Sequence, residues 1–178
     1  MNSYLLSKLR ELGIEEYHLK NYKLPEQKEC GQLVEAEHDV FGRVQLMSPK
    51  TLSCWQKLKR AAKKDNIEIQ LVSAFRSIDY QYNLIMKKLK NGGELSTILK
   101  VNAIPGFSEH HTGHAIDLST TECVPLSDEF ELTPPIVWLQ KNSKTYQISM
   151  SFPRSNSSRL PLTTNSSSML VKAVILNG

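Results

Sequence analysis

The stretch Ser108–Leu118, SEHHTGHAIDL, limits what this chain can fold into more than any other segment. It follows a proline-glycine turn signal at residues 105–106 and ends in an apolar run, a pattern that predicts a loop leading into a strand. Because successive side chains of a strand point to opposite faces, Asp117 shares its face with the small residues Gly113 and Ala115. The Asp117 carboxylate is therefore expected to have open space above it.

A histidine in the same stretch is placed to use that space. His110 precedes Asp117 by seven residues, and from the loop its side chain can fold back over the carboxylate. An imidazole beside a carboxylate provides two ligands of a zinc site. His114 is expected on the opposite face of a regular strand, together with Ile116 and Leu118. The alternative is a polar turn that enters a strand and binds no ion.

A second polar motif lies upstream, where residues 73–77 read SAFRS and Gln81 follows. Alternating apolar residues predict a strand at 67–72, so this motif begins where that strand ends. Gln81 falls in the first turn of a helix expected at 79–90, close to Arg76. Polar residues at the end of a strand commonly handle ligands.

These motifs resemble the signature of the VanY-type zinc D-alanyl-D-alanine carboxypeptidases, within the lysostaphin, D-Ala-D-Ala peptidase and hedgehog fold group. The pattern Ser-x-His-x-x-Gly-x-Ala-x-Asp runs from Ser108 to Asp117. SAFRS with Gln81 is similar to the family's second motif, and residues 105–110 fit its approach to the first ligand. The resemblance covers roughly residues 46–154. It implies an α+β fold in which a small antiparallel sheet carries the site and helices pack on one side.

The resemblance also implies a role for five residues. His110 and Asp117 would be ligands of a zinc ion. Arg76 would be catalytic, holding the substrate carbonyl as negative charge develops on it. Gln81 and Ser108 would contact the substrate, a peptidoglycan stem peptide that ends in D-Ala-D-Ala. The alternative for Arg76 is a surface ion pair, and the choice between D,D and L,D bonds stays open.

A zinc hydrolase needs three protein ligands plus water. The family takes its third ligand and its general base from a Glu-x-x-His segment that follows the strand matching residues 148–152. In the printed sequence no histidine occurs after His114, and no Asp or Glu occurs after Glu131. We therefore expect an incomplete zinc site, weak zinc binding and little or no peptidase activity. A frameshift or a divergence of the tail would explain the difference.

The remaining polar residues do not replace the missing ligand. His111 is adjacent to His110, and both reach one ion only if the backbone is distorted. His18 and His38 show no ligand spacing. The acidic residues around His38 are expected to form a hydrophilic turn between two short strands, because such close neighbours rarely converge on one ion. Glu109 serves as a base only if the loop turns it inward.

Two other functions stay open for this chain. A non-catalytic binder of peptidoglycan peptides would keep Arg76, Gln81 and Ser108 to hold a peptide carboxylate after losing the metal. A degenerate family member would have no function. Release of D-alanine from a pentapeptide in the presence of zinc distinguishes the enzyme from the binder.

The composition favours one globular domain. The chain has 178 residues, of which 40% are hydrophobic and 22% charged, and no apolar run is long enough to span a membrane. The net charge of +4 is modest, and its basic clusters at 57–64 and 87–90 fall on expected helices, so nucleic-acid binding is not expected. We expect a monomer. Cys30, Cys54 and Cys123 are widely spaced and are expected to be buried thiols.

The first 13 residues predict an amphipathic helix, capped by Ser3. They lack the apolar block and the small-residue cleavage site of a signal peptide. As printed, the chain is expected in the cytoplasm, whereas the substrate of the family lies in the cell envelope.

The rest of the chain divides into a domain and a tail. Serine-proline at 48–49 and threonine-proline at 133–134 predict two further helix starts. We expect a single domain over residues 1–154. Residues 155–178 are rich in Ser, Thr and Asn and predict a poorly ordered tail. Within this tail Met169–Leu176 is β-prone but has no obvious partner.

Overall fold

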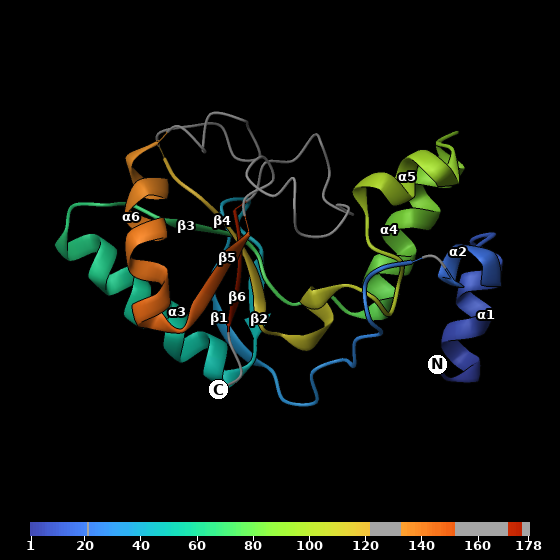
Figure 1. The fold of residues 1–178 in the computed structure, drawn as a ribbon, viewed down its shortest axis with the longest axis horizontal. Coiled ribbons are helices and arrows are strands. Elements are labelled where there is room, and N and C mark those ends of the chain that lie inside the picture. The colour runs from blue at the N-terminus through green and yellow to red at the C-terminus, as the bar shows by residue number, and fades with distance from the viewer. Residues whose placement is uncertain (21, 122–132, 152–170, 176–178) are drawn as a thin grey trace.

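The computed structural model describes residues 1–20, 22–121, 133–151 and 171–175. It has an α+β architecture, in which antiparallel strands lie between two groups of helices (Figure 1). The fold class expected from the sequence is confirmed. Within these residues no helix is both long and apolar enough to cross a membrane.

The larger sheet has four antiparallel strands in the order β3-β4-β6-β5, and β1 and β2 form a separate antiparallel pair. The strands are β1 (Val34–His38), β2 (Val44–Met47), β3 (Gln70–Ser73), β4 (Ala115–Ser119), β5 (Ile148–Ser151) and β6 (Val171–Ile175). β4 lies inside the larger sheet, and all five of its residues are buried. Pairing on both edges satisfies the backbone of β4 and holds its side chains in fixed directions.

Two helices lie together beside the larger sheet, α3 (Pro49–Lys64) and α6 (Pro134–Asn142), and the short 3-10 helix η3 (Ser143–Tyr146) follows α6 (Figure 1). α3 begins as predicted, because the Ser48 hydroxyl accepts a hydrogen bond from the Thr51 N–H and a proline occupies the first helical position. Apolar residues from these helices and the strands form the first core: Met47, Cys54, Trp55, Leu58, Ala62, Ile69, Leu71, Ala74, Ile116, Leu118, Ile136, Leu139 and Ile148.

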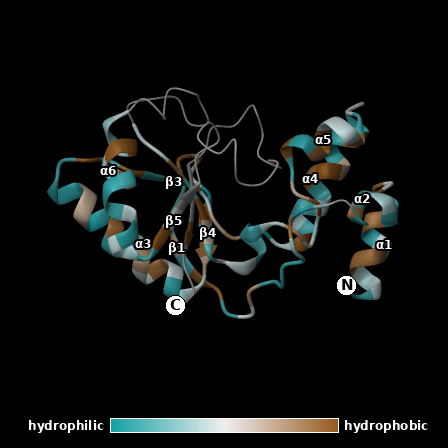
Figure 2. Ribbon diagram, viewed as in Figure 1, coloured by the Kyte–Doolittle hydropathy of each residue, from teal (hydrophilic) through white to brown (hydrophobic). Residues whose placement is uncertain are grey.

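A second group of helices gathers on the other side of the strands (Figure 1). It comprises α1 (Ser3–Glu11), α2 (Glu16–Lys20), α4 (Ile78–Lys90) and α5 (Leu95–Val101). Brown apolar and teal polar segments alternate along α1 and α4, as expected of helices that are buried on one side (Figure 2). The second core contains Leu5, Leu9, Leu12, Ile14, Ile85, Ile98, Ile104 and Phe107.

The N-terminal cap of α1 differs from the prediction. Asn2 is the capping residue, since its side-chain oxygen accepts a hydrogen bond from the Leu5 N–H at 2.8 Å. Ser3 is already the first helical residue. Asparagine and serine are comparable caps, and the sequence alone did not decide between adjacent positions.

The polar segment before β2 is a strand and not the predicted turn. β1 contains Glu37, which forms an ion pair with Lys59 of α3 at 2.8 Å. The turn lies one step later, where the buried Asp39 accepts hydrogen bonds from the backbone N–H groups of Phe41 and Arg43. Backbone pairing with β2 therefore makes this acidic segment a strand.

The larger sheet includes residues that the sequence assigned to the tail. Val171–Ile175 forms β6, which pairs with β4 on one side and with β5 on the other. The expectation that this segment has no partner is wrong. Its β-branched residues suit a strand, but both partners lie far away in the sequence. Residues 155–170 lie outside the described part of the chain.

The cysteines differ in burial. Cys54 is buried in the first core, whereas Cys30 is only partly buried. Cys123 lies outside the described residues.

Candidate metal and substrate site

Asp117 and His110 lie side by side, as the sequence predicted. Asp117 is in β4 opposite Ser73 of β3, and His110 is in the short 3-10 helix η1 (Glu109–Thr112). The distance from His110 Nε2 to Asp117 Oδ2 is 3.3 Å, and each residue is only 3% exposed. The stretch between them therefore folds back on itself to bring an imidazole and a carboxylate together.

Gly113 makes this fold-back possible. It ends η1 with a φ of +68°, a backbone conformation that residues other than glycine rarely adopt. A Cβ at this position would also lie 3.1 Å from Cys30 Cβ and 3.2 Å from the Ser48 backbone nitrogen. Glycine is thus needed here both for the turn and for the close approach of two other segments.

His110 has a second contact, with the backbone. Its Nδ1 lies 2.6 Å from the carbonyl oxygen of Ala74, which only accepts hydrogen bonds, as the Asp117 carboxylate does. The other nitrogen, Nε2, is then directed at Asp117 Oδ2. A carbonyl behind an imidazole is the usual arrangement around a histidine metal ligand. The contact between Nε2 and Oδ2 is favourable when a proton or a cation lies between them.

Arg76 reaches the same carboxylate oxygen. Its Nη2 lies 2.6 Å from Asp117 Oδ2, and its Nε donates to the Ser73 hydroxyl at 3.0 Å. The Arg76 side chain is 25% exposed, so the ion pair is partly shielded from solvent. The Arg76 N–H also donates to the His110 carbonyl at 3.2 Å. The structure therefore brings Arg76, His110 and Asp117 together.

Gln81 and Ser108 are both buried, and in the sequence they lie close to Arg76 and His110, respectively. Gln81 is in the first turns of α4, and its Nε2 donates to the Ala103 carbonyl at 2.8 Å. Within the described part of the chain, Gln81 Oε1 is buried without a hydrogen-bond partner. The Ser108 hydroxyl caps η1 and accepts from the His110 N–H at 3.4 Å. Ser108 thus contacts the backbone of His110, whereas the contact of Gln81 is with the loop before η1.

His111 has a structural role that sequence reasoning missed. Its Nε2 accepts from the Gly106 N–H at 3.1 Å, so its Nδ1 carries the proton and donates to the Arg76 carbonyl at 2.6 Å. Burial lowers the pKa of His111 and favours the neutral imidazole that these two contacts require. In the sequence, only the position of His111 next to His110 could have indicated this structural role.

His114 points away from Asp117, as predicted. Its Nδ1 lies 3.1 Å from the Ser48 hydroxyl and 3.2 Å from the Thr51 hydroxyl, at the start of α3. Burial, and to a lesser extent the charge of Lys50, lowers the pKa of His114. It therefore supports the helix cap and not the candidate site.

Zinc fits the type of the donors at this site but not their number. His110 and Asp117 are suitable zinc ligands, yet a zinc hydrolase uses three. Across residues 1–20, 22–121, 133–151 and 171–175, no group of three or more His, Cys, Asp and Glu side chains could hold a metal ion. In the register of the sheet, the position opposite Asp117 on β6 is Lys172.

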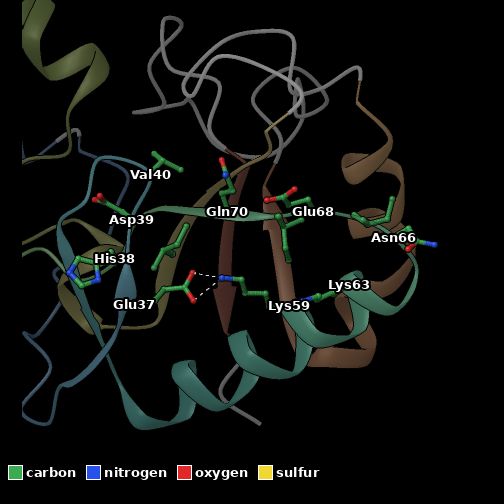
Figure 3. A pocket seen from close by; sticks show the side chains of 12 residues that line it. Glu37, His38, Asp39, Val40, Lys59, Lys63, Asn66, Glu68 and Gln70 are labelled. Carbon is green, nitrogen blue, oxygen red and sulfur yellow. Dashed lines mark hydrogen bonds and ion pairs between the residues drawn. The ribbon is translucent and has the colours of Figure 1, made fainter.

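The groove drawn in Figure 3 lies elsewhere. It has a volume of about 640 Å³ and is lined by β1, the end of α3 and residues 66–71. The ion pair between Glu37 and Lys59 crosses it (Figure 3). Arg76, His110 and Asp117 are not among its lining residues, so this groove is separate from the candidate site.

Comparison with known proteins finds a family model and relatives that match this chain. The family model described as VanY, D-alanyl-D-alanine carboxypeptidase, matches residues 44–165. The chain is 30% identical over 140 residues to YodJ of Bacillus subtilis, which is named as a carboxypeptidase, covering 76% of this chain and 51% of YodJ. It is 34% identical over 102 residues to the bifunctional D-Ala-D-Ala dipeptidase and carboxypeptidase VanXYC of Enterococcus gallinarum, covering 56% of this chain and 50% of VanXYC. The chain thus spans about half the length of these curated relatives.

Solved structures show the same fold. The LD-carboxypeptidase LdcB superposes with a TM-score of 0.70 at 25% identity, over 88% of this chain and 73% of LdcB. A D,D-pentapeptidase VanY solved with Zn(II) gives 0.59 at 20% identity, over 86% of this chain and 83% of that one. VanYB in complex with D-alanine-D-alanine superposes with a TM-score of 0.58 at 21% identity, over 85% of this chain and 80% of VanYB. The match over residues 44–165 shows that this chain belongs to the VanY D-alanyl-D-alanine carboxypeptidase family.

Proposed function

We propose that this chain is a zinc-dependent D-alanyl-D-alanine carboxypeptidase by lineage, acting on peptidoglycan stem peptides, whose zinc site is incomplete. The observation that carries the proposal is the meeting of Arg76 and His110 on one oxygen of Asp117, at 2.6 and 3.3 Å. A fixed cation, an oriented imidazole and a buried carboxylate are the groups that such a peptidase needs beside its substrate. The relatives VanXYC and VanYB act on or bind D-Ala-D-Ala, which supports this substrate class.

The proposed roles follow from the contacts of each residue. Arg76 holds the peptide carbonyl, because its guanidinium is always charged and is partly open to solvent. Its backbone is held on both sides, by the His110 carbonyl and the His111 imidazole, so the charge has a fixed position. Ser108 and Gln81 contact the substrate, and the buried Oε1 of Gln81 favours a partner for it.

His110 and Asp117 are the proposed metal ligands. A zinc ion supplies Lewis acidity and an activated water when it is bound by three protein ligands. Within the 178 residues, neither a third histidine ligand nor an acidic residue follows the matched strand. Loss of a hydrogen-bond partner of a metal ligand alone lowers metal affinity or activity by about 10- to 100-fold. Loss of a general base removes about another 10² to 10⁴ in rate. The proposal is therefore weak zinc binding and little or no peptidase activity.

A calorimetric titration of the purified chain with zinc tests the incomplete site. The expected result is binding too weak to saturate at micromolar zinc. Sub-micromolar affinity with one ion per chain would refute the proposal. An assay of D-alanine release from a pentapeptide with added zinc tests the activity, and release at the rate of an intact family member contradicts the impairment.

A second candidate function is a non-catalytic binder of peptidoglycan peptides. The partly exposed Arg76 guanidinium favours it, because a carboxylate can pair with such a group without a metal. A binder shows zinc-independent affinity for a peptide ending in D-Ala-D-Ala and releases no D-alanine. An enzyme releases D-alanine, and a degenerate member shows neither result.

A further inference from the structure

A segment that precedes the residues matched by the family model runs along the candidate site. Residues 22–33 join the helices of the second group to β1 (Figure 1). Within them, the Gln27 N–H donates to the Gly106 carbonyl at 2.7 Å, and the Cys30 N–H donates to the His111 carbonyl at 2.8 Å. These two hydrogen bonds attach the segment to η1 and to the loop before it, which carry two of the proposed site residues.

Glu29, which lies between those two contacts in the chain, reaches the other side of the site. Its Oε1 accepts a hydrogen bond from the N–H of Ile78, the first residue of α4. The N-terminus of a helix carries partial positive charge, which stabilises a carboxylate placed there. Arg76 precedes Ile78 by only two residues, a span of at most about 7 Å along the chain. The Glu29 carboxylate is therefore held close to the segment that carries Arg76.

The carboxylate of Glu29 is open to a further partner. Glu29 is exposed, and the hydrogen bond from Ile78 uses one of its two oxygens. Among the residues that the structure describes, Glu29 forms no ion pair, whereas Glu26 on the same segment pairs with the amino group of Met1 at 3.0 Å. The second oxygen of Glu29 can thus accept from a donor that arrives from solvent.

A peptide with its carbonyl on Arg76 can place such a donor at Glu29. An extended peptide advances roughly 3.3–3.6 Å per residue, so a side chain one or two residues before the reacting carbonyl spans the separation of Arg76 and Ile78. An ammonium group, with three donors and a positive charge, is the complement of a carboxylate. We propose that Glu29 is a specificity-determining residue, which selects peptides with an ammonium group on the residue that precedes D-Ala-D-Ala.

This inference rests on the proposed function for the position of the peptide on Arg76. Zinc titration and release of D-alanine test the proposed function, whereas the choice between two peptides tests Glu29. A chain that binds zinc tightly and releases D-alanine rapidly can still bind both peptides equally. An inactive chain can still prefer the charged peptide. The two failures are therefore distinguishable.

The test compares acetyl-L-lysyl-D-alanyl-D-alanine with the same peptide after acetylation of the lysine side chain, which removes the positive charge. Calorimetric titration of the metal-free protein measures both Kd values. We expect the wild type to bind the lysine peptide about 5-fold more tightly, near the upper end for an exposed ion pair. This preference is expected to fall at high salt, because salt screens exposed charges.

Glu29→Gln is the variant that isolates the charge. Glutamine keeps an oxygen that accepts from the Ile78 N–H but carries no negative charge. The variant is expected to bind both peptides with the same Kd. Glu26→Gln is the matched control, because it removes an equal charge from a carboxylate of the same segment that pairs with the Met1 amino group. It is expected to keep the wild-type preference.

Several results overturn the proposal. The first is equal affinity of the wild type for the two peptides, or no measurable binding of the lysine peptide. The second is a preference that remains in Glu29→Gln. The third is an equal loss in Glu26→Gln, which would assign the effect to net charge. If Glu29→Gln does not fold, the wild type alone decides, because a preference that is unchanged between low and high salt contradicts an exposed ion pair.

Discussion

Arg76 Nη2 lies 2.6 Å from Asp117 Oδ2, the same oxygen that His110 Nε2 approaches at 3.3 Å. A guanidinium thus occupies a position next to the oxygen that a metal ion between His110 and Asp117 would use. Charge-assisted hydrogen bonds of this length are strong, and Asp117 is buried. Binding of a cation at this carboxylate therefore competes with Arg76.

Replacing Arg76 by methionine is expected to strengthen zinc binding while it weakens peptide binding. The variant removes the competing cation but leaves His110 and Asp117 in place. We expect the Kd for zinc to fall by about 10-fold, roughly 1.4 kcal/mol. Calorimetric zinc titrations of wild type and variant measure it. Arg43→Met, which removes a positive charge outside the site, is the control and is expected to leave the Kd unchanged. Equal or weaker zinc binding by Arg76→Met would rule out the competition.

A histidine at position 172 is expected to complete the ligand set. Position 172 is opposite Asp117 in the register of β4 and β6, and opposite positions have Cβ atoms about 4.5–5.5 Å apart. Lys172→His should tighten zinc binding by at least about 10-fold, because a third ligand joins the first two. Ser149→His is the matched control, since β6 separates its strand β5 from β4. Similar zinc affinities for the two variants would show that position 172 does not reach the site.

Replacing His111 by leucine is expected to destabilise the fold. His111 is fully buried and bridges the Arg76 carbonyl and the Gly106 N–H. Leucine leaves both groups without this partner, at an expected cost of about 2 kcal/mol or more in the free energy of unfolding. His111→Gln keeps one donor and one acceptor and should lose clearly less. Urea unfolding of the three proteins measures the difference, and equal losses for the two variants would argue against the bridge.

Stability is expected to fall in mild acid, in part through His114. Its pKa in the folded protein is lowered, first by burial and then by Lys50. The unfolded chain, with a pKa of about 6.5, therefore binds the proton more readily than the folded one. This contribution is fully present above about pH 6.5 and is lost as the pH falls toward the folded pKa.

His114→Gln should flatten that dependence. Urea unfolding at a series of pH values gives the slope for wild type and variant. The pKa of His111 is lowered in both proteins, so the difference between their slopes measures the contribution of His114 alone. Identical slopes would mean that His114 does not contribute.

Much of the local structure could be predicted from the sequence, because its signals are short-range. The Ser48 cap before a proline and the spacing of Trp55 and Leu58 place α3. The alternation around Asp117 predicts the face on which its carboxylate lies. The seven-residue separation from His110, with a glycine between them, allows the two side chains to meet, but by itself it leaves open a polar turn that binds no ion.

Contacts between distant segments decided the rest. β6 is a strand only because β4 and β5 offer it partners, and β1 is a strand although its residues suggest a turn. The Gln45 side chain hydrogen-bonds the Ala74 N–H, 29 residues away, and the His111 side chain hydrogen-bonds the Arg76 carbonyl, 35 residues away. No local sequence pattern predicts hydrogen bonds between such distant residues. The sequence by itself determined which groups can do chemistry. The tertiary structure decided which backbone atoms hold them, since each hydrogen bond needs a partner that only the folded chain brings near.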